Sequence, residues 1–206
     1  MSRYTGPKAK RWRRIGQIPD DGAATTVQRR TYPPGQHGLR RRAKLSEYAQ
    51  QLHEKQKARY TYGLQERQFA NYYRKADAAN GVTGTLLMQM LERRLDNVVY
   101  RLGFAASRGQ SRQMVSHGHV RLNGKKIDIP SYQISAKDEI ALSDAYTKTV
   151  TKLRGDDEET ETEAASIPDW LSADSKKLTG TVIELPERTQ IDTSINEQLI
   201  VEYYSR

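Results

Sequence analysis

The stretch from Arg93 to Gly124 constrains the fold of this chain more than any other. It reads as a helix, a tight turn, a second helix and the first strand of a hairpin that closes at Asn123-Gly124. Asn-Gly is the strongest short-range hairpin signal, because both residues tolerate the positive φ angles of a type I′ turn. Ser107 and Gln110 form a capping-box pattern that begins the second helix. The stretch therefore predicts a compact α+β unit.

Apolar residues spaced three and four apart predict helices before this unit. The first should begin at Ser46 and end at Gly63, the second should run from about Gln65 to Ala79, and the third from about Thr85 to Gly103. After the unit's helices, apolar and polar residues alternate through Val120 and Ile140, which predicts antiparallel strands.

Charge is divided unevenly along the chain. Residues 1–80 hold 18 Lys and Arg against 6 Asp and Glu, residues 81–154 hold 12 against 6, and residues 155–206 hold 4 against 13. A basic body is the footprint of a protein that binds a polyanion, and we favour nucleic acid over acidic lipid or a role in solubility alone. The acidic last quarter repels phosphate, so it should face solvent or a basic neighbouring protein.

These patterns predict an α+β fold: a helical domain plus a small α+β RNA-binding module, in which a helix-turn-helix precedes antiparallel hairpins, with a basic extended N-terminal arm. The expected segments are the arm 1–44, the helical domain 45–92, the module 93–154, an acidic linker 155–166 and a C-terminal segment 167–206. The acidic run 156–163 is typical of a solvated linker. We expect residues 167–206, with a helical stripe of Ile195, Leu199, Ile200 and Tyr203, to pack back on the helical domain.

Residues 1–44 are rich in Arg and interrupted by Gly and Pro, with little apolar periodicity. Such a segment buries too little surface to fold by itself. A disordered basic tail is one interpretation. We favour an arm that becomes ordered on RNA, with Trp12, Tyr32 and His37 available to stack on bases. The rest of the chain should then fold without the arm.

The candidate RNA contacts are basic, aromatic or hydrogen-bonding side chains at caps, turns and exposed helix faces. Arg108 and Arg112 share one helix face, and the helix N-terminus at Ser107 offers N–H groups to an anion. On the first long helix, a solvated face and phosphate contact are equally good interpretations of the outward-facing cations. The full set is Arg3, Tyr4, Lys10, Arg11, Arg13, Arg14, Arg29, Arg30, Tyr32, Gln36, His37, Arg40, Arg41, Arg42, Lys55, Lys57, Arg59, Arg108, Gln110, Ser111, Arg112, Ser116, His117, Asn123, Lys125 and Lys126.

The search for catalytic and metal-binding patterns is negative. The chain has no Cys, which excludes disulfides, thiol catalysis and Cys-ligated zinc. It has no Gly-rich phosphate loop, no Gly-x-Ser-x-Gly and no His-Glu-x-x-His motif. His117 and His119 form a candidate metal pair, but no further ligand is near them in sequence. No apolar run approaches the roughly 20 residues that span a bilayer. We expect a cytosolic protein that is not an enzyme and has no metal and no cofactor.

Several separate segments resemble bacterial-type small-subunit ribosomal proteins of the S-four family. They are residues 1–7, 32–38, 54–57, 62–69, 94–103 and 196–206. The resemblance implies a structural ribosomal subunit in which a helical domain carries the RNA-binding module and the C-terminal helix returns to the helical part. Some family members bind zinc through four Cys in the arm. This chain has none, so RNA rather than metal should order its arm.

The resemblance also implies a primary binder of 16S ribosomal RNA that folds the 5′ domain early in assembly of the 30S subunit. It implies a place near the channel through which messenger RNA enters, beside the S-three and S-five families, and a contribution to translational accuracy. Repression of the protein's own messenger is a further implied role. No membrane and no small-molecule substrate is expected. The implied location is the cytoplasmic ribosome, with the ribosome of an organelle as the alternative.

Two other classes of protein remain as alternatives. Pseudouridine synthases and tyrosyl-tRNA synthetases carry the same module beside a large catalytic domain, whereas arm, helices and tail account for the rest of this chain. A free RNA chaperone or regulator is the second alternative. In a sucrose gradient at moderate salt, a ribosomal protein should sediment with 30S particles. An enzyme or a free regulator should stay mostly at the top.

Overall fold

The computed structural model describes residues 4–18, 23–39, 44–143, 146–147, 167–174, 178–191 and 194–206. Arg3, Arg40, Arg41, Arg42 and the expected linker 155–166 lie outside the described residues. The chain divides into two compact units. Unit 1 comprises residues 1–87 and 193–206, and unit 2 comprises residues 88–192.

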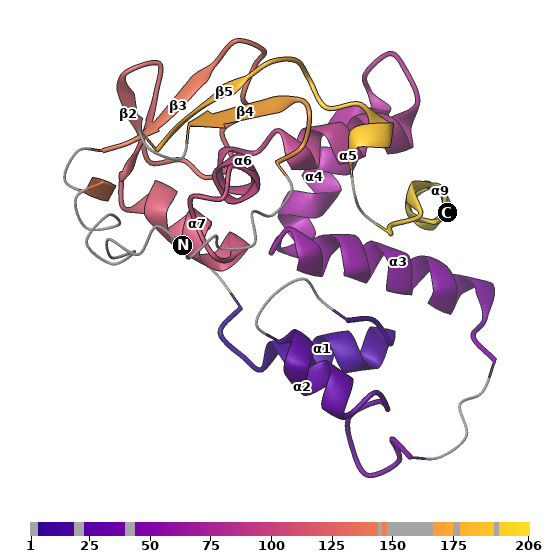
Figure 1. Ribbon diagram of the computed structural model, residues 1–206. Coiled ribbons are helices and arrows are strands. Elements are labelled where there is room, and N and C mark those ends of the chain that lie inside the picture. The colour runs from indigo at the N-terminus through magenta and orange to yellow at the C-terminus, as the bar shows by residue number, and fades with distance from the viewer. Residues whose placement is uncertain are drawn as a thin grey trace. The chain divides into compact units, whose positions relative to one another are not determined.

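Unit 1 is helical (Figure 1). Its elements are α1 (Lys8–Ile15), α2 (Ala24–Arg29), α3 (Glu47–Thr61), α4 (Glu66–Asp77), the first part of α5 (Thr83–Glu92) and α9 (Glu197–Tyr204). The predicted start of α3 is confirmed, because the Ser46 hydroxyl accepts a hydrogen bond from the Ala49 amide at 3.3 Å. Gly63 follows the helix with a φ of +63°, a backbone conformation that suits glycine.

The arm contributes to the core of unit 1, which corrects one expectation. Residues 8–15 and 24–29 are helical, and Trp12 is only 7% exposed. Its ring meets Tyr60 of α3 edge-on, with the centroids 6.1 Å apart, and Val27 of α2 is also buried. Trp12 is therefore committed to packing rather than available to stack on a base. Apolar periodicity missed these helices because each is short and buries only one residue.

Helix α9 packs on α3 within unit 1. Ile195 and Ile200 are buried, and Tyr204 stacks on Tyr73 with the ring centroids 4.6 Å apart. Leu199, which the sequence places in the buried stripe, is only partly buried. Residues 194–206 thus return to the helical unit, as the family resemblance implies.

Unit 2 has two layers, and the expected α+β fold class is confirmed. Helices α6 (Leu95–Arg101) and α7 (Arg108–Ser116) cover one face of a five-stranded antiparallel sheet (Figure 1). Its strand order is β2-β1-β3-β5-β4. The strands are β1 (Val120–Leu122), β2 (Lys125–Ile127), β3 (Glu139–Leu142), β4 (Leu171–Asp174) and β5 (Thr179–Val182). Apolar side chains from both helices and from the inward face of the sheet form one core.

The sequence predicts one helix from Thr85 to Gly103, but the structure divides it at residues 93 and 94. Helix α5 ends at Glu92, and Arg94 is extended, with φ −68° and ψ 134°. The Leu95 amide donates to the Tyr132 carbonyl at 2.9 Å, and the Ile134 amide donates to the Arg93 carbonyl at 3.0 Å. The loop before β3 therefore forms hydrogen bonds with the Leu95 amide and the Arg93 carbonyl, which a continuous helix would use for its own hydrogen bonds. Apolar periodicity carries no record of such a long-range contact.

The placement of β4 and β5 corrects the expectation that all of residues 167–206 pack on the helical domain. β5 pairs with β3, with Ile140 opposite Gly180, and β4 pairs with β5. Gly180 leaves room for Leu102, because a Cβ there would lie 2.6 Å from a methyl carbon of Leu102 and would force that side chain to shift. Residues 167–174 and 178–191 thus belong to unit 2. Local patterns do not show a pairing between strands so far apart in sequence.

Replacing Trp12 by Ala should lower the free energy of unfolding by about 3–5 kcal/mol, the usual effect of deleting a buried aromatic side chain. Urea denaturation followed by circular dichroism measures this change. Ile18→Ala is the matched control, because Ile18 lies in the same arm but is 54% exposed. It should change stability by no more than about 0.5 kcal/mol. Equal, small effects would show that the arm does not contribute to the core.

Glu66 should make the stability of unit 1 depend on acid. Burial by itself would raise the pKa of Glu66, but hydrogen bonds from Lys55 and Tyr204 and the charges of Lys55 and Arg59 outweigh it and lower the pKa. Such a carboxyl stabilises the folded state above its unfolded pKa, and this stabilisation is lost as pH falls through the folded pKa. The free energy of unfolding should decline below about pH 4.5. In Glu66→Gln this decline should be shallower. In Glu47→Gln, at an exposed position, the free energy of unfolding should decline with falling pH as it does in the wild type.

Candidate nucleic-acid interface

The predicted capping box at the start of α7 forms only in part, because the Gln110 side chain bonds the Ala106 amide rather than the Ser107 amide. The Ser107 hydroxyl accepts from the Gln110 amide at 3.3 Å, and the Gln110 side-chain oxygen accepts from the Ala106 amide at 2.9 Å. The helix ends at Ser116, and Gly118 follows with a φ of +73°. Gln110, a candidate RNA contact, is thus an exposed residue whose side-chain oxygen stabilises the helix start.

The predicted Asn-Gly hairpin is also confirmed. Asn123 and Gly124 have φ angles of +50° and +78°, as a type I′ turn requires. The Asn123 side chain accepts from the Glu139 amide and donates to the Asp138 carboxylate, both at 2.8 Å. Lys125 and Lys126 follow on β2, and both are exposed.

The hairpin lies against the end of α7. A Cβ at Gly118 would clash with the Lys126 side chain, so the two are in direct contact. This contact brings the candidate lysine of the hairpin to the C-terminal turn of α7, where His117 is exposed. The structure therefore gathers candidates from both elements at one edge of unit 2.

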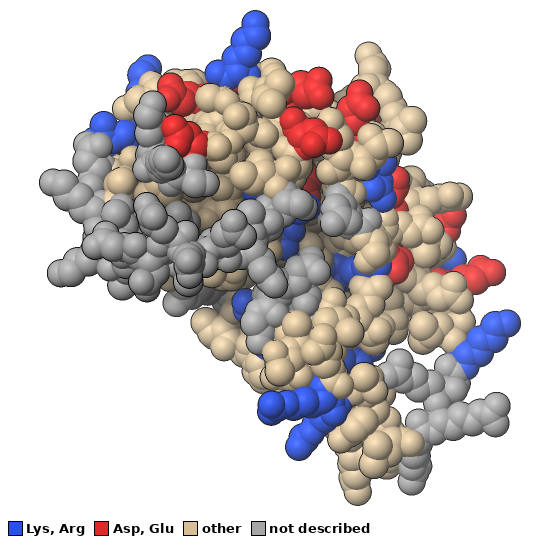
Figure 2. Space-filling view, viewed as in Figure 1, with Lys and Arg blue, Asp and Glu red and all other residues tan. Residues whose placement is uncertain are grey.

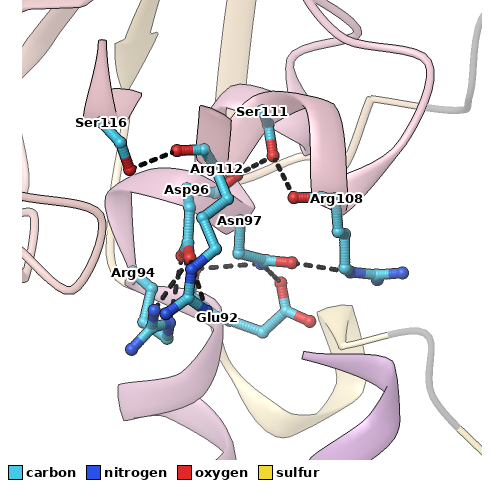
Figure 3. A network of polar contacts seen from close by, with 8 residues as sticks. All are labelled: Glu92, Arg94, Asp96, Asn97, Arg108, Ser111, Arg112 and Ser116. Carbon is cyan, nitrogen blue, oxygen red and sulfur yellow. Dashed lines mark hydrogen bonds and ion pairs between the residues drawn. The ribbon is translucent and has the colours of Figure 1, made fainter. Parts of the chain in front are cut away.

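Below α7 lies a buried polar network, shown in Figure 3. Asp96 is 5% exposed and receives two hydrogen bonds from Arg94, at 3.0 Å from Nε and 2.8 Å from a terminal nitrogen. A terminal nitrogen of Arg112 lies 3.8 Å from the same carboxylate. Arg94 is itself fully enclosed, so its charge is compensated inside the protein and does not reach an external ligand.

Glu92 forms the second centre of the network. It is 1% exposed and receives a bidentate pair from Arg101 at 3.2 and 2.9 Å. The Asn97 amide nitrogen donates to Glu92 at 2.6 Å, and the Asn97 oxygen accepts from Arg108 Nε at 3.0 Å. The Arg108 guanidinium lies 4.5 Å from the centre of the Tyr100 ring.

The network brings four arginines to two carboxylates, so these six side chains carry a formal charge of +2. Arg94 and Arg101 form the close bidentate pairs. Arg108 and Arg112 are only partly buried and lie one turn apart on α7, so both side chains reach the surface. In Figure 3 the Arg108 guanidinium points away from Asn97 and out of the network. This arrangement suits an anion with several oxygen atoms, such as a phosphate.

Ser111 is an interior residue, which contradicts the expectation that it contacts RNA. It is fully buried, and its hydroxyl donates to the Asp96 carbonyl at 2.6 Å. The signal was available in the sequence, because Ser111 lies one turn before Val115 on the core-facing side of α7. Ser116, another candidate, donates to the Arg112 carbonyl at 2.8 Å and is partly buried.

The cations of α3 are not on its outer surface, which corrects a second expectation. Lys55 is 3% exposed and its ammonium lies 2.9 Å from Glu66. Lys57 is equally buried and donates to the Ser194 carbonyl. Arg59 is partly buried and pairs with Glu66 at 3.3 Å. The reason is that α9 and the residues before it cover this side of α3, a contact between distant parts of the sequence.

In the arm, two candidate arginines contact tyrosines. Arg11 lies over Tyr4 and also over Tyr60, 4.8 Å from that ring centre. Arg13 donates to the Tyr32 carbonyl at 3.0 Å and lies over its ring at 4.8 Å. The other described candidates of the arm are exposed: Lys10, Arg14, Arg29, Arg30, Gln36 and His37. Their contact with RNA stays a prediction.

The exposed charged side chains of the sheet differ in sign between its two ends. The exposed side chains of β1 and β2 include Arg121, Lys125 and Lys126. Those of β3, β4 and the segments beside β4 and β5 include Glu139, Asp169, Asp174, Glu184 and Glu187. In Figure 2, acidic side chains are visible over this part of unit 2, with basic side chains beside them. Among the described residues, exposed cations thus lie at the hairpin end of the sheet and exposed acids lie toward the end that holds β4.

The two histidines of the candidate metal pair lie near each other, with ring centroids 6.0 Å apart, and His119 stacks on Tyr146 at 4.5 Å. Within the described part of the chain, no group of three or more His, Cys, Asp or Glu side chains is arranged to hold a metal ion. Among the described helices, none has the length and apolar character needed to cross a bilayer.

Replacing Asp96 by Ala should lower the free energy of unfolding by about 3–5 kcal/mol, because it leaves the Arg94 charge buried without its partner. Guanidinium denaturation of the full chain measures this loss. Asp128→Ala is the control, since Asp128 is an exposed acid of the same unit and should have an effect within about 0.5 kcal/mol. If the two variants unfold alike, the network is not what holds α6 and α7 together.

Comparison with known proteins agrees with this architecture. Residues 3–92 match the family model of the ribosomal protein S4/S9 N-terminal domain, and residues 93–140 match that of the S4 domain. The boundary between the two matches coincides with the break between α5 and α6.

The chain is also similar over its whole length to curated relatives. It is 50% identical over 214 residues to the small ribosomal subunit protein uS4 of Syntrophomonas wolfei, covering all of both chains. It is 50% identical over 206 residues to the uS4 protein of a Nocardioides species, and 48% identical over 207 residues to that of Christiangramia forsetii, again over both full lengths.

Proposed function

Because the chain belongs to the ribosomal protein uS4 family, we propose that it is a structural protein of the small ribosomal subunit that binds ribosomal RNA. The observation that carries this proposal is the set of basic side chains that reach the surface on α7 and on the hairpin: Arg108, Arg112, Lys125 and Lys126. Its place is in the ribosome. The family is structural rather than catalytic, which favours this function over an RNA-modifying enzyme.

We propose two groups of RNA contacts. In unit 2 they are the exposed or partly exposed candidates of α7 and the hairpin: Arg108, Gln110, Arg112, Ser116, His117, Asn123, Lys125 and Lys126. In unit 1 they are the exposed or partly exposed candidates of the arm: Tyr4, Lys10, Arg11, Arg13, Arg14, Arg29, Arg30, Tyr32, Gln36 and His37. The buried Ser111, Lys55 and Lys57 are left out of both groups, because their polar atoms serve the protein interior.

The finer parts of the proposal come from the family resemblance. The RNA is 16S ribosomal RNA, bound early and through its 5′ domain. The neighbouring proteins belong to the S-three and S-five families, and messenger RNA passes nearby in a cytoplasmic ribosome. The exposed acidic residues around β4 and β5 support a basic protein, rather than RNA, as the neighbour of that surface.

RNA binding should depend steeply on salt, and Arg108 and Arg112 should account for part of that dependence. Each neutralised phosphate contributes about 0.7–0.9 to the slope of log affinity against log salt. The double variant Arg108→Ala/Arg112→Ala should therefore lower the slope by about 1.4–1.8. Filter binding of a 16S ribosomal RNA transcript across a salt series measures it.

Lys75→Ala is the control for this measurement, because Lys75 is an exposed cation of α4 outside the proposed contacts. Its slope should equal that of the wild type. A double variant that keeps the full slope would remove Arg108 and Arg112 from the interface. A wild-type protein without affinity for the transcript would contradict the function itself.

A further inference from the structure

We propose that Asp138 is a positioning residue for RNA binding: its carboxylate fixes the turn of the β1–β2 hairpin, and thereby the direction in which Lys125 and Lys126 meet a phosphate. Asp138 lies directly before β3, and its negative charge would repel a phosphate rather than bind one. The inference rests on the proposed RNA-binding function and adds to it a residue that acts only through the hairpin.

The hairpin that carries the two lysines is short and lies at one side of the sheet. Strand β2 has three residues, and in the described sheet it is an edge strand that pairs with β1 alone. A two-stranded ribbon has little stability of its own and twists readily. Lys125 and Lys126 begin this strand directly after the Asn123-Gly124 turn. The direction of both side chains therefore depends on what holds the turn in place.

Three hydrogen bonds from Asn123 attach the turn to the start of β3. The Asn123 amide N–H donates to the Glu139 carbonyl, and the Asn123 side-chain oxygen accepts from the Glu139 amide, both at 2.8 Å. The side-chain nitrogen donates to the Asp138 carboxylate, also at 2.8 Å. A flipped side chain would place its NH₂ group against the Glu139 N–H and its oxygen against the carboxylate. Asp138 therefore fixes the orientation of the Asn123 side chain.

Asp138 is itself held by two further contacts. Its other carboxylate oxygen accepts from the Ser135 amide at 2.7 Å, and its carbonyl accepts from the Val182 amide at the end of β5 at 3.0 Å. The carboxylate thus joins the hairpin turn to the turn that precedes β3. Both of its bonds are accepted, by different oxygen atoms, and an amide offers only one acceptor oxygen. A carboxylate is therefore required to make both bonds.

The charge of Asp138 gives its two effects on RNA binding opposite signs. A carboxylate beside the hairpin repels a phosphate backbone, so electrostatics alone predicts that removal of the charge strengthens binding. Positioning predicts the reverse, because a hairpin that is no longer held must be ordered when RNA binds, and this ordering lowers the affinity. The sign of the change in affinity therefore distinguishes the two effects.

Asp138→Asn removes the charge with little change in size and loses one of the two accepted hydrogen bonds. In the full-length protein it should bind a 16S ribosomal RNA transcript about fivefold more weakly than the wild type at fixed salt. Asp128→Asn is the matched control, because Asp128 is an exposed acid directly after β2. It should bind as tightly as the wild type or about twofold more tightly. Equal or tighter binding by Asp138→Asn would overturn the proposal.

Exchange of the two side chains is a rescue test. In Asn123→Asp/Asp138→Asn the net charge is unchanged, and the amide and the carboxylate can still bond each other while each accepts from a backbone amide. Aspartate also suits the first position of the turn. Asn123→Asp alone sets two carboxylates against each other and should bind about fivefold more weakly. The exchange should restore affinity to within about twofold of the wild type, whereas losses that multiply to about twenty-fivefold would contradict the proposal.

NMR relaxation of the free protein shows directly whether the turn is held. The heteronuclear NOE of the Gly124 and Lys125 amides should fall in Asp138→Asn and recover in the exchange variant. The value for Ile140, a buried residue of β3, should stay at its wild-type level and report an intact fold. An unchanged NOE at Gly124 and Lys125 in Asp138→Asn would show that the carboxylate does not position the hairpin.

If Asp138→Asn does not fold, Asn123→Gly tests the same contact from the other side, because glycine suits the positive φ of the turn but has no side chain for Asp138 to hold. It should bind about fivefold more weakly. Asn80→Gly, at an exposed asparagine that also precedes a glycine, should bind like the wild type. Full affinity in Asn123→Gly would overturn the proposal but leave the RNA-binding function standing, whereas a wild type that fails to bind the transcript would remove that function.

Discussion

The pairing of Arg94 with Asp96 is the interaction on which the rest of unit 2 depends. Both side chains are buried, so neither charge is acceptable without the other. The pair forms because the backbone leaves the helical conformation at Arg94, which ends α5 and lets α6 begin at Leu95. The same break exposes backbone groups that the loop before β3 satisfies. One local interruption therefore determines where α6 begins and which path the loop takes. It also positions α7, because the Ser111 hydroxyl of that helix donates to the Asp96 carbonyl.

The network beneath α7 combines buried ion pairs with two arginines that reach the surface. With four arginines over two carboxylates, the deeper pairs stabilise the fold and the outer arginines face the surface. The cations of α3 show the opposite case, since Lys55 and Lys57 are fully used within unit 1. Net basic charge in a sequence thus overstates the charge that a ligand can meet.

Much of the site was predictable because its signals are local. The cap at Ser107, the Asn123-Gly124 turn and the basic pair on α7 depend on residues within a few positions of one another, and all three form. The errors concern contacts between distant segments. Burial of Trp12 depends on Tyr60, and β5 finds β3 across a long connection. The buried hydrogen bonds of Asn97 were also missed, because a single amide in an apolar helix stripe carries no pattern until its partners are placed around it.

The acidic last quarter of the chain is divided between the two units. Strands β4 and β5 extend the sheet of the RNA-binding module on the side away from the hairpin. Their exposed acids and those of the flanking segments therefore stand at one end of the sheet, with the lysines of β2 at the other. Because carboxylates repel phosphates, the described residues make the β2 end of the sheet the more favourable side for a polyanion.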